Sequence, residues 1–349
     1  MNPQGALRVV KPGSVSRPRR PKPSAKTALR RARKKTTAPR KRIPASRRRH
    51  YRRRRAAAPL RIYEERPSDS LVANEEYDRG YQAGLIEGGE RLLEEYAPPD
   101  VIIPDLTARE AMAAGIEALR DRGLPVLDSA SVFEELNTAL REKKPYAFIR
   151  LGDGELLTMA QETVLSIDEI KRSGAFLPYA GVTVPNLEAR DELASCVQFA
   201  SLVGVPMSRK PHYQPLLFAV LRAHRIDYRK LRYTSSTMNY KLEEQGLLWK
   251  LLSGRKILIV GDAAPQLGRA LTDKGYEVTG IVSPVDGYGD VARVLAEATA
   301  CEYDIALIAA GVSAIPIAVH LAGMGGKVTF DFGHLANKIA GLEHPERKA

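Results

Sequence analysis

The chain has 349 residues and a formal net charge of +13, a length that indicates two domains or one domain with extended tails. Residues 1–55 hold 22 lysines and arginines and no acidic residue, so the rest of the chain carries 32 basic against 41 acidic residues, a net of −9. The two cysteines, Cys196 and Cys301, form no CxxC pair and no His/Cys cluster in the sequence. This argues against a disulfide framework or a thiolate zinc site, and it fits a reducing, cytoplasmic location.

Residues 1–57 consist mainly of Arg, Lys, Pro, Ser and Ala. Such a segment cannot bury enough apolar surface to offset its chain entropy, so we expect a disordered basic arm. No apolar segment follows it, so no signal peptide is expected. The charge predicts a polyanionic partner such as nucleic acid, an anionic membrane or an acidic polymer, bound in a salt-dependent way. A solubilising or self-associating tail without a dedicated partner is the alternative.

Residues 58–105 are expected to form a helical linker segment, and residues 106–349 an α/β domain. Gly80, Gly84 and Gly88 recur at a spacing of four, which places them on one stripe of a helix. Each interior glycine costs about 1 kcal/mol relative to alanine, so the stripe indicates either a packing partner or a weak helix. An oligomer contact and a frayed linker helix both remain open.

Two capping boxes predict helix starts, at Thr107 with Glu110 and at Ser131 with Glu134. Beyond them, short apolar runs alternate with amphipathic segments. The expected strands are AFIRL, ASLVGVP, RKILIVG, YEVTGIVSP, YDIALIAAG and KVTFDFG, and the expected helices are PLLFAVLRAHRI, PQLGRALTDKG, DVARVLAEAT and SAIPIAVHLAGMG. This alternation predicts a doubly wound α/β fold with a mostly parallel sheet and helices on both faces.

The most apolar stretch begins at Ile305 and raises the question of a membrane span. It contains Gly311, Ser313, Pro316 and His320, and Asp304 precedes it. We therefore interpret it as a buried strand, a turn and a helix, and we expect no transmembrane segment.

Parallel sheets bind ligands at the carboxyl ends of their strands. The first such end is RLGDGE, where Asp153 and Glu155 flank Gly154 after Arg150. Two carboxylates beside an open face suit Mg²⁺ or Mn²⁺, and the arginine fork suits a phosphate. The two acidic residues are explained equally well as part of a helix N-terminus, where negative charge is favoured by the helix dipole.

Three further strand ends carry polar residues. Gly261 and Asp262 open GDAAPQLG, which lacks the three-glycine spacing of a dinucleotide fingerprint. Gly311 and Ser313 precede a helix whose free N–H groups suit a phosphate, although an ordinary turn explains them as well. In DFGH, Asp331 and His334 end the last strand, and a capped or core histidine is the commoner reading for the latter.

Taken in order, FIRLGDGE, VGVP, KILIVGDAA, IALIAAGVSAIPIAVHLAG and DFGH resemble the GT-D type glycosyltransferases over residues 130–340. The resemblance implies a GT-D/Rossmann-like fold, a nucleotide-sugar donor, typically a UDP-sugar, and a divalent cation. It implies that Asp153 and Glu155 hold the metal and the diphosphate, and that Arg150 contacts phosphate.

The remaining roles are our own placements beside this resemblance. Gly152 and Gly154 are placed among the residues that bind the donor at this turn, and Gly261 and Asp262 are placed near the nucleoside. Gly311 and Ser313 are placed at the donor phosphates. Asp331 and His334 are placed at the rim of the cleft, and the general base remains open among Asp262, Asp331 and His334.

The leading hypothesis is a metal-dependent glycosyltransferase that acts on a glycan or protein acceptor and is tethered by its arm. An S-adenosylmethionine or dinucleotide enzyme is one alternative, but Ser283-Pro284 stands where an acidic ribose contact is required. A nonenzymatic binding or assembly protein with a degenerate transferase fold is the other.

Overall fold

The computed structural model describes residues 67–342, with side chains from Glu76 onward. The prediction of a disordered arm over residues 1–57 lies outside the described residues. The chain divides into two units at Gly88 and Gly89, and the two are described separately. The predicted boundaries at residues 57 and 105 stay predictions.

In the first unit, the described residues belong to α1 (Pro67–Tyr96), which continues into the second. Tyr77 and Tyr81 stack with ring centroids 6.3 Å apart. Apart from the neighbouring backbone of α1 itself, a Cβ atom added at Gly80, Gly84 or Gly88 would meet no described atom of the first unit within 4 Å. An oligomer contact through the glycine stripe stays a prediction.

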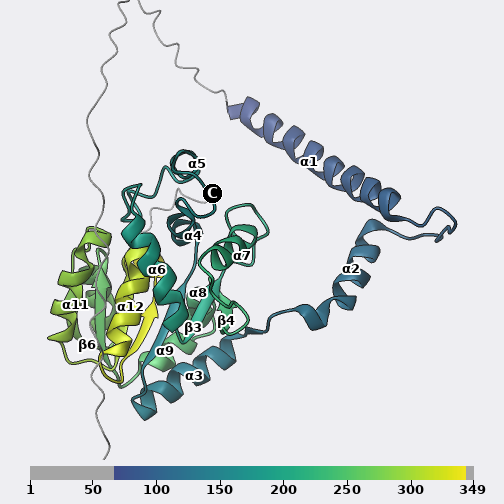
Figure 1. Cartoon of the computed structure of the whole chain (residues 1–349). Helices are drawn as coiled ribbons and strands as arrows, with labels where there is room; N and C mark the ends of the chain where they lie inside the picture. Colours follow the sequence, from purple (N-terminus) through teal and green to yellow (C-terminus); the bar gives the residue numbers. More distant parts are fainter. Residues whose placement is uncertain (1–66, 343–349) are drawn as a thin grey trace, which may run out of the picture. The chain divides into compact units, whose positions relative to one another are not determined.

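The second unit contains one sheet of eight strands, all paired in parallel within the described residues. The strands are β1 (Val126–Leu127), β2 (Tyr146–Arg150), β3 (Leu202–Val205), β4 (Tyr233–Ser235), β5 (Lys256–Gly261), β6 (Glu277–Val282), β7 (Ile305–Ala309) and β8 (Val328–Asp331). Their order across the sheet is β1-β4-β3-β2-β8-β7-β5-β6. Figure 1 shows β6 towards one end of the sheet and β3 and β4 towards the other.

Helices cover both faces of this sheet, as the sequence pattern predicts. One face is covered by α4 (Asp153–Ala160), α6 (Leu187–Phe199), α7 (Gln214–Ala223), α11 (Val291–Thr299) and α12 (Ala314–Gly323), and α5 (Ile167–Ser173) adds Ile170 to the same core. The other is covered by α3 (Ser129–Glu142), α8 (Met238–Glu244), α9 (Leu247–Leu252), α10 (Ala264–Asp273) and α13 (Leu335–Ile339). The remaining elements of this unit are α2 (Ala108–Ala118) and three short 3₁₀ turns, η2 (Arg120–Arg122), η3 (Tyr288–Asp290) and η4 (Gly311–Ser313).

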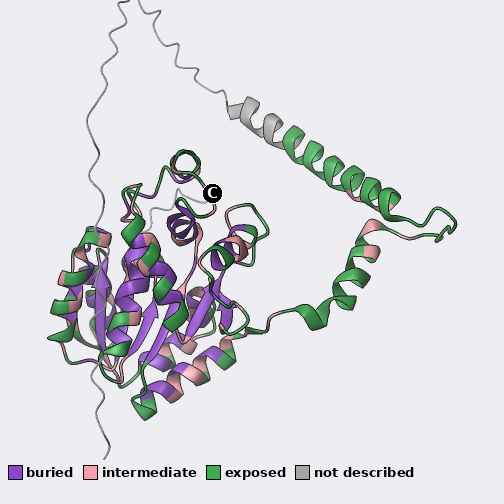
Figure 2. Ribbon diagram, viewed as in Figure 1, coloured by how far each residue is buried: buried purple, intermediate pink, exposed green. Residues whose placement is uncertain are grey.

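The strands contribute side chains to two separate hydrophobic cores, because successive side chains of a strand point to opposite faces of the sheet. In β2, Ile149 packs in the core beneath α4, α6 and α12, and Phe148 packs in the core beneath α3, α8 and α10. Phe148 stacks on Phe330 of the neighbouring strand with centroids 4.9 Å apart. Figure 2 shows these buried strands between helices with exposed outer sides. Burial on both faces explains the continuous apolar runs of the sequence.

The helix starts were predicted with mixed success. At α2, both bonds of the Thr107–Glu110 capping box are present. The box predicted at Ser131 is wrong, because α3 begins at Ser129 and its N-cap is Asp128, which accepts a hydrogen bond from the Ser131 N–H at 2.8 Å. An aspartate is as good an N-cap as serine, and here it lies three residues earlier.

The apolar stretch from Ile305 forms β7, η4 and α12, as expected. Within the described residues, no helix combines the length and the apolar character needed to cross a membrane. The two shortest strands, β1 and β4, were not predicted, because two or three residues carry too little periodicity to be recognised.

Candidate functional site

The centre of the carboxyl edge of the sheet is a charged cluster between β2 and β8, made of Arg150, Glu155 and Asp331. The Arg150 guanidinium donates to Asp331 twice, from Nη2 to Oδ1 at 2.9 Å and from Nε to the carbonyl oxygen at 3.0 Å. Its Nη1 donates to the carbonyl oxygen of Ser236 at 3.1 Å, and its backbone N–H donates to Asp331 Oδ2 at 3.1 Å. Both Asp331 oxygens are therefore engaged, while three of the five side-chain N–H donors of Arg150 are used.

This ion pair is largely shielded from water, with side-chain exposures of 18% for Arg150 and 6% for Asp331. Burial raises the pKa of the Asp331 carboxyl, and the charge and hydrogen bonds of Arg150 oppose the rise. Breaking such a pair from one side costs about 3–5 kcal/mol, because the remaining charge is left uncompensated.

Glu155 is the third member of the cluster. Its Oε2 accepts a hydrogen bond from the Gly152 N–H at 2.8 Å, so the carboxylate caps the N-terminus of α4. Burial and then the negative charge of Asp331 raise the pKa of Glu155 to about 7, although Arg150 lowers it. The cluster thus contains two carboxylates, Glu155 and Asp331, and only one guanidinium, Arg150, to balance their charge.

Asp153 occupies the first position of α4 with a half-buried side chain, and its Oδ1 accepts from the Gly154 N–H at 2.9 Å. Residues two apart on a helix do not share a face. Accordingly Glu155 is directed at Gly152, and Asp153 is bonded beside Gly154. The two carboxylates lie at one helix end but are held by different backbone groups.

Glycines make room for the Arg150 side chain. Gly333 has φ +52°, and a Cβ atom there would lie 1.8 Å from Arg150 Nη2. A Cβ at Gly204 of β3 would lie 3.0 Å from Arg150 Cγ. The glycine of DFGH is therefore required both by its left-handed backbone and by the guanidinium next to it.

The predicted residues on β5 and β7 lie at the same edge of the sheet. Gly261 has φ +134°, and a Cβ there would lie 2.1 Å from the carbonyl oxygen of Ala309. Asp262 is exposed, and its Oδ1 accepts from the Val285 N–H at 2.9 Å. Gly311 has φ +54° and closely approaches the carbonyl of Ala180.

Two predicted residues are less well placed for ligand contact than their neighbours. Ser313 is completely buried, and its hydroxyl has no hydrogen-bond partner among the described residues. The Ser313 hydroxyl is therefore shielded from a ligand at the surface. His334 lies at the start of α13 with an exposed side chain, outside the charged cluster.

Sequence reasoning missed the contribution of α8 to this site. Asn239 is buried, and its Nδ2 donates to the carbonyl oxygen of Phe332 at 2.9 Å, while its Oδ1 has no partner among the described residues. The preceding loop supplies the Ser236 carbonyl that Arg150 binds. No motif in SSTMNY signals this role, because α8 meets β8 only in the folded chain.

A second polar group, formed by Glu192, Cys196 and His320, was also missed. Their side-chain ligand atoms all lie within 4.8 Å of one another. The sequence shows no His/Cys cluster because two of these residues are on α6 and the third is on α12. Glu192 accepts a hydrogen bond from the Tyr288 hydroxyl, and its Oε1 lies 2.9 Å from His320 Nε2. Burial raises the pKa of the Cys196 thiol to about 12.

The architecture and the charged strand ends define a doubly wound α/β protein with a candidate ligand site at the carboxyl edge of its sheet. The family model of the GT-D fold-like domain, GT-D-like, matches residues 127–339. The chain therefore belongs to the GT-D-like family. No curated protein matches it.

Three solved structures are similar to this chain, each with 16% sequence identity. One is described as a new glycosyltransferase (DUF1792) from Streptococcus sanguinis, with coverage of 62% of this chain and 83% of that chain and a TM-score of 0.42. Another, described as a domain of unknown function 1792, has coverages of 62% and 80% and a TM-score of 0.40. The third is described as a domain 1792 with a distinct glycosyltransferase fold, with coverages of 65% and 83% and a TM-score of 0.44.

Proposed function

We propose that this protein transfers a sugar from a nucleotide-sugar donor, a UDP-sugar, to a hydroxyl group of a glycan or protein acceptor. Membership of the GT-D-like family gives the fold of a glycosyltransferase. The observation that carries the proposal is the cluster of Arg150, Glu155 and Asp331 at the carboxyl edge between β2 and β8. Charged groups are costly to bury without a partner, so a site that retains them is suited to a charged ligand.

We propose that the site holds a divalent cation, Mn²⁺ or Mg²⁺. Asp153 and Glu155, both at the start of α4, would supply the hard oxygen ligands that these ions prefer. Burial and the charge of Asp331 raise the pKa of Glu155 to about 7, and a cation bound nearby would favour its charged form. When bound, the cation would act as a Lewis acid on the leaving diphosphate.

The protein's own residues would support transfer in several ways. Two N–H donors of Arg150 remain for a donor phosphate after the bonds to Asp331 and Ser236. Asp331 has both oxygens engaged by Arg150, so we assign it a positioning role and not that of the general base. Asp262 and His334 are exposed at this edge and stay the candidates for the base.

The backbone at the carboxyl edge suits the remaining parts of the donor. Gly261 and Asp262 are proposed to lie near the nucleoside, and Gly311 and Ser313 near the phosphates, with Gly152 and Gly154 allowing close approach at α4. For the basic arm, we propose electrostatic tethering to a polyanion, which the 22 positive charges of residues 1–55 support.

Calorimetric titration of the full chain with UDP, with and without Mn²⁺, tests the proposal. We expect binding that depends on the metal and is lost in Asp153→Asn. The matched control is Asp168→Asn, which removes an exposed carboxylate from the first turn of the neighbouring helix α5. If UDP and other nucleoside diphosphates fail to bind with any metal, the transferase proposal is refuted and a nonenzymatic binding protein is favoured.

A further inference from the structure

A cavity of about 460 Å³ lies at the β1-β4-β3 end of the sheet. Its walls come from the segment that runs from η2 into β1, from the end of β3, from α7, from the loop that follows α7 and from β4. None of the candidate transfer residues lines it. Its size falls within the range of about 300–1,000 Å³ that is usual for small-molecule sites. This cavity is therefore a second candidate ligand site in the same unit.

The inner wall of the cavity is aromatic and held in place. Phe218 of α7 meets Tyr228 edge to face, with ring centroids 5.5 Å apart and an interplanar angle of 71°. The hydroxyl of Tyr233 donates to the carbonyl oxygen of Tyr228 at 2.6 Å. Because these contacts fix the rings before any ligand arrives, an apolar or planar group would bind against them with little ordering cost.

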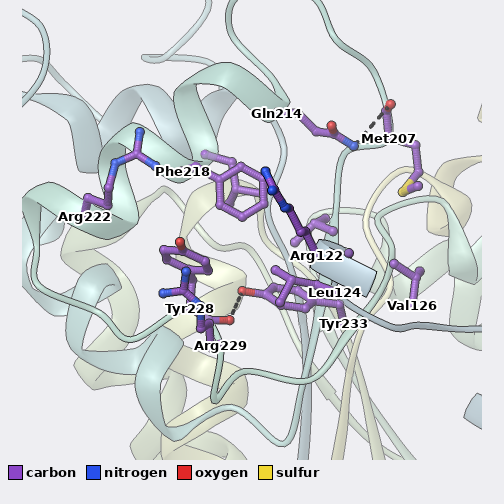
Figure 3. Close-up of a pocket in the computed structure, with 13 residues that line it drawn as sticks. Arg122, Leu124, Val126, Met207, Gln214, Phe218, Arg222, Tyr228, Arg229 and Tyr233 are labelled. Carbon is purple, nitrogen blue, oxygen red and sulfur yellow. Dashed lines mark hydrogen bonds between the residues drawn. The ribbon is translucent and has the colours of Figure 1, made fainter. Parts of the chain in front are cut away.

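Three arginines surround these aromatic side chains, as Figure 3 shows for Arg122, Arg222 and Arg229. The lining contains no aspartate or glutamate. No ion pair among the described residues involves any of the three. The nearby carboxylate of Asp227 pairs instead with Lys230 at 3.5 Å. The three side chains are exposed, so they give the rim an uncompensated positive charge.

The guanidinium of Arg229 lies 4.8 Å from the centroid of the Tyr228 ring. Stacking of this kind orients the planar fork and leaves its N–H groups free to bind an oxyanion. The cavity thus combines an apolar, aromatic interior with three guanidinium groups around its rim.

We propose that this cavity binds an organic anion. Its phosphate or carboxylate group binds at the rim, where Arg122, Arg222 and Arg229 supply the positive charge, and its apolar or aromatic body lies against Phe218 and Tyr228. The proposal concerns a site separate from the transfer centre and does not depend on the transferase reaction. Because the arginines are exposed, each adds a modest amount to affinity, and the aromatic wall supplies the rest.

Calorimetric titration of the full chain with 1-naphthyl phosphate tests this site. We expect saturable binding with one equivalent. Arg222→Gln and Arg229→Gln should each weaken it about two- to five-fold, the range of an exposed charge pair. The control is Arg269→Gln, which removes an exposed arginine from α10 on the opposite face of the sheet and should leave the affinity unchanged.

Two further probes define the ligand class. 1-Naphthol lacks the anionic group and should bind at least about tenfold more weakly, which corresponds to about 1.4 kcal/mol. 1-Naphthoic acid compares carboxylate with phosphate, and the tighter of the two anions identifies the preferred head group. The proposal is overturned if no probe binds at millimolar concentration, if naphthol binds as tightly as the anions, or if both arginine variants bind like the native chain.

Discussion

The Arg150 side chain is closely packed against Gly333, so the loss of folding stability in Gly333→Ala can be estimated from the structure. In Gly333→Ala, the new methyl group would lie 1.8 Å from Arg150 Nη2, whereas carbon and nitrogen atoms in contact are normally separated by about 3.5 Å or more. The guanidinium is the end of a flexible side chain and can move away. To do so, it must give up its bond to Asp331 Oδ1. Losing a charge-assisted hydrogen bond in a buried site costs about 1.5–3 kcal/mol.

The left-handed backbone of Gly333 adds a second cost, about 1–2 kcal/mol for any residue with a Cβ atom. Gly246→Ala separates the two effects. Gly246 has φ +70°, but a Cβ atom there would meet nothing within 4 Å. The control variant therefore carries the backbone cost without the collision, and we expect Gly333→Ala to lose about 1.5–3 kcal/mol more than Gly246→Ala.

Urea denaturation of both variants measures this difference directly. In a thermal melt, the additional loss corresponds to a further fall of roughly 3–12 °C in Tm for a unit of this size. UDP binding in Mn²⁺ should weaken in Gly333→Ala alone, because only that variant displaces Arg150. Equal losses of stability in the two variants would show that the guanidinium is not held against Gly333, and the proposed geometry of the cluster would fail.

The other predictions concern the metal ligands, the cysteines and the arm. Asp153→Asn and Glu155→Gln should each lower the rate of sugar transfer by roughly a hundredfold or more. The Glu155→Gln variant keeps a side-chain oxygen that can accept the hydrogen bond from the Gly152 N–H, so the helix cap is retained. Retained turnover at saturating Mn²⁺ would contradict the metal assignment. In the folded protein, a thiol reagent should modify the half-buried Cys301 well before the buried Cys196, because burial raises the pKa of the Cys196 thiol to about 12. Equal rates of modification of the two cysteines, measured by mass spectrometry, would refute this prediction. Removal of residues 1–57 should leave sugar transfer to small acceptors intact and abolish polyanion binding. If the full chain binds a polyanion equally well at low and high salt, electrostatic tethering is contradicted.

Much of the fold was predictable because its signals are local. The apolar runs AFIRL, KILIVG and IALIAA predict buried strands, and in the structure they form β2, β5 and β7. Their two-sided burial explains why the runs are continuous and not alternating. The start of α3 was misplaced because Asp128 and Ser131 are both acceptable caps, and the local sequence does not choose between them.

The candidate site was only partly predictable. The sequence singled out Arg150, Glu155 and Asp331 separately, as residues at strand ends. It did not reveal that Arg150 and Asp331 pair directly, since 181 positions separate them and only the adjacency of β2 and β8 brings them together. Nor did it reveal Asn239, whose place beside Phe332 depends on how α8 packs on the sheet.

By itself, the sequence determined the alternation of strands and helices, the basic arm and the residues that stand at the strand ends. These follow from periodicity, composition and turn chemistry, which act over a few neighbouring residues. Only the tertiary structure decided which strand ends meet, which carboxylate pairs with Arg150, and that three arginines surround an aromatic cavity at the far end of the sheet. Such contacts depend on strand order and helix packing, because burial and charge act on residues that are close in space and distant in the chain.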